Sequence, residues 1–187
     1  MFSARRVHHT YADYVQLERD SRVKHEYCDG EIYAVAGGTP EHGALAMLLA
    51  TILREQLPAS CNLLSSDVKV RIAASDLATY PDLSVVCGPL ERDSVDATAI
   101  VNPTVLVEVT SPSSKDYDRG EKLSHYKQLP SLRLVILVSH ENPRVTMVER
   151  ETQGWSIREF RAGEVALAEA PALRIDVDRL YAVLGTL

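Results

Sequence analysis

The chain has 187 residues, of which 45% are hydrophobic and 25% charged, and this composition suits one globular domain spanning residues 1–187. No apolar run reaches the roughly 20 residues that cross a bilayer, and no apolar signal core follows the basic N-terminus. The net charge of −6 argues against broad, non-specific attraction to nucleic acid. We therefore expect a cytoplasmic protein without a membrane partner.

The cysteines give a second indication of the compartment. Cys28, Cys61 and Cys87 are odd in number and widely spaced, which predicts reduced thiols rather than a disulfide framework. His25 and Cys28 have the spacing of metal ligands, but no second close pair completes a zinc site.

The first half of the chain alternates helical and extended patterns. Thr10 is a predicted N-cap with Asp13 as a partial capping box, and Asp29-Gly30 is a strong hairpin dipeptide. The predicted elements are a helix over 11–19, a hairpin over 25–37, a helix starting near 40 and ending before 58, and strands at 61–64, 68–73 and 81–87.

The second half predicts a strand, a helix and another strand in succession. Its predicted elements are a loop or short helix over 88–102, a strand at 104–110, a helix over 117–128, a strand at 132–138, a hairpin over 144–160, and a final strand entering a short helix from 174. This order indicates a mixed α/β protein.

Basic residues on the extended segments allow two interpretations. Lys69 and Arg71 alternate with apolar residues, and Arg22 and Lys24 lie earlier in the chain. The four can form a phosphate-facing patch, although a solvated strand face is the favoured reading.

Glu108 is a carboxylate inside an otherwise apolar predicted strand, where burial is costly unless something compensates it. Asp82 stands at the start of another predicted strand. Two carboxylates on neighbouring strands can bind one hard divalent cation, which would offset the cost of burying Glu108. Asp82 as a turn residue and Glu108 paired with an arginine remain the structural alternatives.

Lys122 follows on the predicted helix, four residues before Tyr126 and on the same face. A helix packed beside strand 104–110 would bring this lysine toward the two carboxylates. The alternative is an ordinary solvated helix face.

Five motifs together resemble the Uma-type endonucleases, a bacterial branch of the PD-(D/E)XK superfamily. They are "HEYCDGEIY", "PEH" opening a helix, "YPDLSVV", "LVEVTSPSS" and "YDRGEKLSHYKQL", which span residues 10 to 140 in the family's order. The resemblance implies a single restriction-endonuclease-like α/β (α+β) core, with a mixed β-sheet flanked by helices and the site at the sheet's split edge.

The resemblance also implies the ligands and the lysine of the site. Asp82 matches the motif aspartate and Glu108 the second acidic ligand, together holding Mg²⁺ or Mn²⁺. The superfamily often places a lysine two residues after that glutamate, where this chain has Thr110. In the Uma-type branch the lysine comes from the following helix, and Lys122 matches it.

Two further residues enter the candidate site through the same resemblance. Glu26 matches the acidic residue before the early turn, with a salt bridge to the nearby Lys24 as its alternative. His42 matches the histidine at the start of the second helix, where the helix dipole disfavours its protonation.

The sequence thus predicts a metal-dependent nuclease that hydrolyses phosphodiester bonds, with DNA favoured over RNA as the nucleic-acid partner. A homodimer is compatible with cutting both strands of a duplex. The main alternative is a catalytically inactive nuclease-fold module that binds nucleic acid or a protein partner. A carboxylate-pair glycosidase is disfavoured by the low aromatic content of 6% with one Trp.

Overall fold

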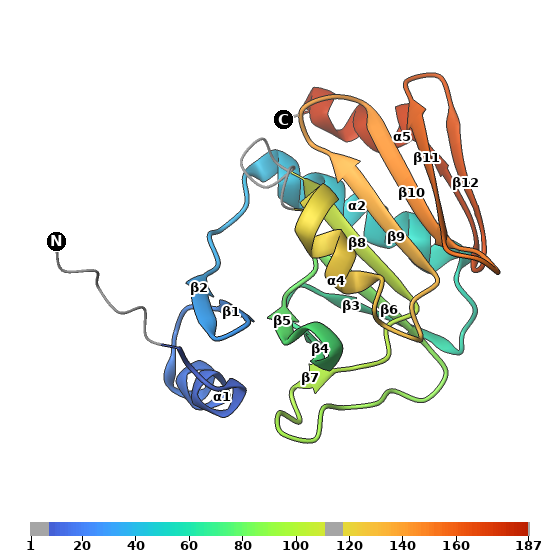
Figure 1. Cartoon of the computed structure of the whole chain (residues 1–187). Helices are drawn as coiled ribbons and strands as arrows, with labels where there is room; N and C mark the ends of the chain where they lie inside the picture. Colours follow the sequence, from blue (N-terminus) through green and yellow to red (C-terminus); the bar gives the residue numbers. More distant parts are fainter. Residues whose placement is uncertain (1–7, 111–117, 187) are drawn as a thin grey trace, which may run out of the picture.

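The computed structural model describes residues 8–110 and 118–186, and the strands of this part of the chain form three sheets (Figure 1). The six-stranded sheet has the spatial order β11 (Trp155–Arg161), β10 (Arg144–Arg150), β9 (Leu134–Ser139), β8 (Val105–Thr110), β6 (Leu83–Cys87) and β3 (Cys61–Ser65). Strands β8 and β9 pair in parallel, whereas their outer neighbours pair antiparallel. The sheet is therefore mixed, as the family resemblance implies.

A second sheet lies beside the first and carries the N-terminal hairpin. Its order is β2 (Glu31–Ala34), β1 (His25–Cys28), β5 (Leu77–Thr79), β4 (Lys69–Ile72) and β7 (Ala99–Ile100), with a short 3₁₀ turn η1 (Ala73–Ser75) between β4 and β5. Asp29 and Gly30 turn the hairpin with φ of 45° and 84°, as the dipeptide predicts. Strand β7 falls inside the segment 88–102, which had been expected to lack strands.

One face of the six-stranded sheet packs against α2 (Pro40–Gln56) and the C-terminal elements. These are β12 (Val165–Glu169), β13 (Ala172–Asp176), α5 (Val177–Tyr181) and η3 (Ala182–Thr186). Helix α2 buries one apolar stripe, formed by Leu45, Leu49, Ile52 and Leu53. The predicted final strand and helix are confirmed, while β12, the partner of β13, was not predicted.

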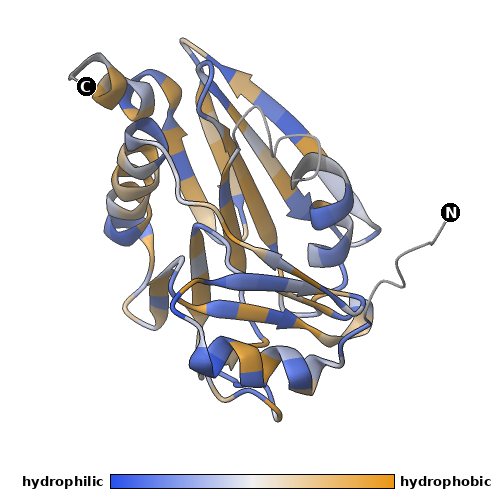
Figure 2. Ribbon diagram, turned by 90° about the vertical axis from the view of Figure 1, so that its left-hand side faces the viewer, coloured by the Kyte–Doolittle hydropathy of each residue, from blue (hydrophilic) through white to orange (hydrophobic). Residues whose placement is uncertain are grey.

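The opposite face packs against the helical segment between β8 and β9, which consists of η2 (Asp118–Lys122) and α4 (Leu123–Tyr126). Leu123 and Tyr126 are buried there against Leu106 and Leu137. Figure 2 shows the central strands as largely hydrophobic, with helices on either side. This crossover between parallel strands carries Lys122 over the sheet.

Local sequence signals account for the helix ends. Helix α1 (Tyr11–Asp20) begins with a full capping box, in which Asp13 N–H donates to Thr10 Oγ1 and Thr10 N–H donates to Asp13 Oδ2 at 2.8 Å. Thr39 caps α2, and Pro40 occupies its first turn. No helix in the described ranges is long and apolar enough to span a membrane.

Lys69 and Arg71 are buried, so both expectations for them are wrong. Lys69 is 3% exposed with Nζ 2.6 Å from Asp96 Oδ2, and Arg71 is 7% exposed and pairs with Asp76. Both also lie over tyrosine rings, among them that of Tyr11. The predicted alternation failed because both faces of β4 are covered.

The expectation of three reduced thiols is also wrong for two of them. Cys61 and Cys87 form a disulfide, with Cα atoms 4.0 Å apart. They are 26 residues apart in sequence, but β3 and β6 pair so that these two residues stand directly opposite each other. Cys28 is the free cysteine.

Candidate active site

Asp82 and Glu108 lie at the same end of two paired strands. Leu83 of β6 pairs with Val107 of β8, and extending this antiparallel register by one residue sets Asp82 opposite Glu108. Strand β8 continues past the end of this ladder, and Val109 N–H donates to Asp82 Oδ2 at 2.7 Å. The carboxylate of Asp82 is therefore anchored to the residue next to Glu108.

Glu108 is 5% exposed, and its described partners on the crossover helix are themselves buried. Lys122 Nζ lies 2.9 Å from Glu108 Oε1, and Tyr126 OH donates to the same oxygen. Lys122 is itself 6% exposed. A charge-paired, hydrogen-bonded carboxylate of this kind can be retained inside a strand. The ionic contact described for Glu108 is with this lysine, and the burial of Lys122 shows that the expected solvated face is wrong.

Glu26 joins the cluster from the second sheet. Its Oε1 lies 3.4 Å from Lys122 Nζ and accepts hydrogen bonds from Thr79 Oγ1 and from Tyr80 N–H, the latter at 3.3 Å. The ammonium of Lys122 thus lies beside one carboxylate from each sheet. The alternative salt bridge of Glu26 is wrong, because Lys24 pairs with another carboxylate.

His42 reaches Asp82 from the first turn of α2. Its Nε2 lies 3.2 Å from Asp82 Oδ2, and its backbone N–H donates to the Thr39 cap. A Cβ on Gly38 would lie 2.8 Å from His42 Nδ1, so glycine leaves room for the imidazole at this position. The five residues singled out from the sequence therefore form two contact groups. Glu26, Glu108 and Lys122 form one, and His42 and Asp82 form the other. Val109, next to Glu108 on β8, connects them through its hydrogen bond to Asp82.

A comparison with family models matches residues 11–180 to the Uma2 family, described as "Putative restriction endonuclease". The chain belongs to the Uma2 family. Two Synechocystis sp. proteins, both described as uncharacterized, are similar to it: slr1290 is 35% identical over 171 residues, and sll1609 is 28% identical over 168 residues. These matches cover 90% and 89% of this chain, and 89% and 94% of the respective relatives.

A solved structure supports the fold of this Uma2 protein. A crystal structure described as "a putative nuclease belonging to DUF820", from Anabaena variabilis, superposes with a TM-score of 0.72. The superposition covers 92% of this chain and 97% of the Anabaena chain. The two sequences are 16% identical, and at that level the similarity supports the fold alone. The fold is restriction-endonuclease-like, as expected.

The donor set of the Uma2 site suits a hard divalent cation. Glu26, Asp82 and Glu108 supply carboxylate oxygens, the ligands that such cations prefer. Among the described side chains of this cluster, three carboxylates face the ammonium of Lys122, and the excess of negative charge favours a bound cation. In the described part of the chain, both contacts of Asp82 use Oδ2.

The sequence did not identify Tyr126 and Thr79 as parts of this cluster. Burial raises the pKa of the Tyr126 hydroxyl well above its usual value, and the neighbouring Glu108 carboxylate raises it further. Tyr126 therefore stays protonated and can donate to Glu108. Its spacing of four from Lys122 was the available signal, whereas nothing in the sequence relates Thr79 to Glu26.

Proposed function

We propose that this Uma2-family protein is a metal-dependent nuclease that hydrolyses phosphodiester bonds in DNA, with Mg²⁺ or Mn²⁺ held by Asp82 and Glu108. The observation that carries the proposal is the hydrogen bond from Val109 N–H to Asp82, which holds one carboxylate next to the residue that bears the other. Oxygen-only donors and family membership agree with it.

The cation would polarise a phosphate oxygen and lower the pKa of a water molecule. Asp82 would hold the cation while its Oδ2 keeps the contacts with Val109 N–H and His42 Nε2. His42 orients Asp82, and Tyr126 orients Glu108 through its hydroxyl.

Lys122 has the charge-stabilising role in this proposal. Its ammonium contacts Glu108 and Glu26, and in this role it would stabilise negative charge on the phosphate and orient the attacking water. A fixed charge that acts mainly in the transition state supports chemistry more than substrate binding.

Asp82→Asn tests the assignment. We expect loss of Mn²⁺-dependent cleavage of a DNA duplex in single turnover, with an unchanged circular dichroism spectrum, because the amide keeps an acceptor but loses the charge. Asp67→Asn is the matched control, since Asp67 is an exposed carboxylate paired with Lys24. If Asp82→Asn cleaves like the parent, Asp82 is not a ligand.

The same assay separates the alternative function. A parent protein that binds DNA but never cleaves it with Mg²⁺ or Mn²⁺ would be the inactive binding module. Parallel reactions on RNA test the preference for DNA, and sedimentation of the active protein tests whether it is a homodimer, the state compatible with cutting both strands of a duplex.

We also propose a cytoplasmic location, because DNA is found there in bacteria. The Cys61–Cys87 disulfide is the observation against it, since disulfides are rare in reducing compartments. Thiol labelling of rapidly quenched cell fractions tests whether Cys61 and Cys87 are reduced, as a cytoplasmic location predicts, or joined in the disulfide.

A further inference from the structure

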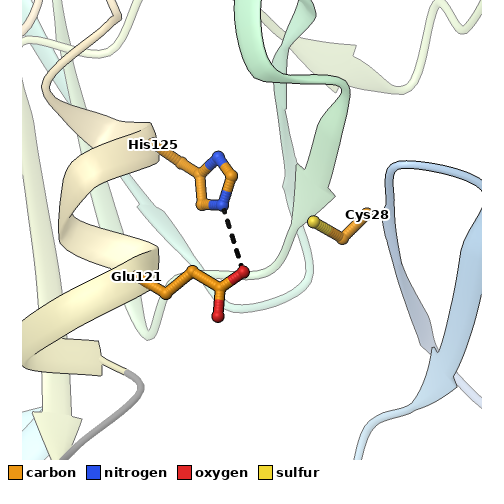
Figure 3. Close-up of side chains that lie close together, drawn as sticks. All are labelled: Cys28, Glu121 and His125. Atoms are coloured by element: carbon orange, nitrogen blue, oxygen red, sulfur yellow. Dashed lines mark ion pairs between the residues drawn. The ribbon is translucent and has the colours of Figure 1, made fainter.

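A second cluster of side chains lies beside the candidate active site. Cys28, Glu121 and His125 place a sulfur, a carboxylate oxygen and an imidazole nitrogen within 4.8 Å of one another. Figure 3 shows Glu121 and His125 extending from the helical segment toward Cys28 of strand β1. None of the three takes part in the proposed hydrolysis.

Regular spacing on two elements explains why these groups meet. Glu26 and Cys28 are two residues apart on β1 and share a face, while the intervening Tyr27 is buried on the other side against α1. Glu121 and His125 are four residues apart on the helical segment, immediately before Lys122 and Tyr126. The strand and the helix therefore meet in two neighbouring layers.

We propose that Cys28, Glu121 and His125 form a cation site for Zn²⁺ or a transition metal of the same class, separate from the carboxylate site. Thiolate and imidazole are preferred ligands of zinc and poor ligands of Mg²⁺. Three protein ligands leave a fourth position for water or another donor. The two sites thus differ in metal class, because one offers only oxygen and the other sulfur, nitrogen and oxygen.

His125 provides an independent observation. Both of its ring nitrogens are buried, and neither has a hydrogen-bond partner among the described residues. Glu121 Oε1 lies 3.9 Å from His125 Nε2, which is too far for a hydrogen bond. A buried polar group without a partner is costly, and a metal bond would satisfy one of these nitrogens.

The charge around Cys28 also favours a bound cation. Burial raises the pKa of the Cys28 thiol, and Glu121 is the first of several carboxylates that raise it further. A divalent cation reverses this effect, because it stabilises the thiolate that binds it.

The distances need only small side-chain adjustments. Atoms within 4.8 Å of one another share a point no more than about 2.8 Å from each, whereas zinc lies about 2.0–2.3 Å from such ligands. Glu121 is exposed, with 66% of its side chain accessible, so it can move inward without disturbing the core.

A metal here would fasten β1 to the crossover helix. Glu26 lies on that strand, and Lys122 lies on that helical segment. Bound metal would therefore also restrain the contact between Glu26 and Lys122, although the proposal itself concerns only binding.

Co²⁺ is the first probe, because thiolate coordination produces a sulfur-to-cobalt charge-transfer absorption that carboxylate sites do not. We expect this band when Co²⁺ is added to the full chain, and its loss when Zn²⁺ is then added. The variant Cys61→Ser/Cys87→Ser retains Cys28 as its only cysteine and should keep the band.

Three single variants identify the ligands. Cys28→Ser should abolish the band, and His125→Gln and Glu121→Gln should each weaken Co²⁺ binding by roughly tenfold or more. His140→Gln, at a histidine outside the cluster, is the matched control. Glu121→Gln changes an exposed side chain, so a folding defect would not explain its effect.

A thermal shift supplies the second readout. Zn²⁺ should raise the Tm of the parent and slow alkylation of Cys28, and both effects should disappear in His125→Gln. Absence of the charge-transfer band in the parent, or equal binding by His125→Gln, would overturn the proposal. Neither result depends on cleavage, so the outcome is independent of Asp82 and of the nuclease assay.

Discussion

Lys122 links the stability of this protein to its proposed chemistry. Its ammonium lies 2.9 Å from Glu108 Oε1 and 3.4 Å from Glu26 Oε1, and all three side chains are largely buried. Removing the cation of a buried ion pair leaves a carboxylate charge uncompensated, which is strongly destabilising. A substitution at Lys122 therefore has two consequences that need separate measurements.

For Lys122→Met without metal, we expect a loss of about 3–5 kcal/mol in the free energy of unfolding, measured with urea. Single-turnover cleavage under saturating Mn²⁺ should fall by roughly 100-fold or more. Lys24→Met is the control, because its pair with Asp67 is exposed and should contribute no more than about 1 kcal/mol. Equal cleavage rates for Lys122→Met and the parent would remove Lys122 from the chemistry.

Tyr126→Phe isolates the hydrogen bond that supports Glu108. Removing the hydroxyl leaves Glu108 with one donor fewer in a buried position, and we expect a loss of about 1–3 kcal/mol in unfolding free energy. Tyr33→Phe, at a half-exposed tyrosine, should change little. If Tyr126→Phe matched the parent in stability, the hydroxyl would not stabilise Glu108.

The candidate site residues meet where strands and helices begin or end. Asp82 precedes β6, His42 opens α2, and Glu108 lies near the end of β8. Glu26 is supplied by a different sheet, whose strand β5 ends at the Thr79 hydroxyl that binds it. The pairing of these elements, rather than any single element, defines the cluster.

The Cys61–Cys87 disulfide fastens β3, the edge strand of the six-stranded sheet, to β6. We expect reduction to lower the free energy of unfolding by about 2–4 kcal/mol, because the reduced unfolded chain loses a constraint that spans 26 residues. Urea unfolding with and without a reductant measures the effect. In Cys61→Ser the reductant should have no effect, whereas a response equal to the parent's would show that another group is responsible.

Over the whole molecule, buried tyrosines should make the fold sensitive to alkali. Burial is the largest cause of a raised pKa at each of these tyrosines. It raises the pKa of Tyr27 to about 12. The others with a raised pKa are Tyr11, Tyr14, Tyr80, Tyr126 and Tyr181. Below about pH 10 these hydroxyls are protonated in both states. Above it the unfolded chain loses these protons while the folded chain retains them, which favours unfolding.

We therefore expect the free energy of unfolding to fall steadily as the pH rises above about 10. Urea unfolding at a series of pH values, with tyrosinate absorbance followed in parallel, measures both the fall and the ionisation. Tyr27→Phe should reduce the slope. Constant stability through this range, or ionisation of all tyrosines before unfolding, would contradict the assignment.

Local signals in the sequence were sufficient for most elements of the fold. The Thr10 capping box, the Asp29-Gly30 turn and the start of α2 at Pro40 depend on residues within a few positions of one another. The strand–helix–strand order around Glu108 indicated a mixed α/β protein, and the mixed sheet was implied by the family resemblance. Asp82, Glu108 and Lys122 were singled out by their positions in predicted elements as well as by motif resemblance, whereas Glu26 and His42 came from the resemblance alone; the roles of all five remain proposals.

Only the tertiary structure decided which distant groups meet. Lys69 and Arg71 alternate like a solvated strand, yet neighbouring elements cover both faces of β4. The pairing of Cys61 with Cys87 depends on the register of β3 against β6, and the approach of Cys28 to His125 on the packing of a strand against a helix. Periodicity indicates which side of an element is apolar. Register and packing depend on contacts between elements that are distant in sequence, so no local segment determines them.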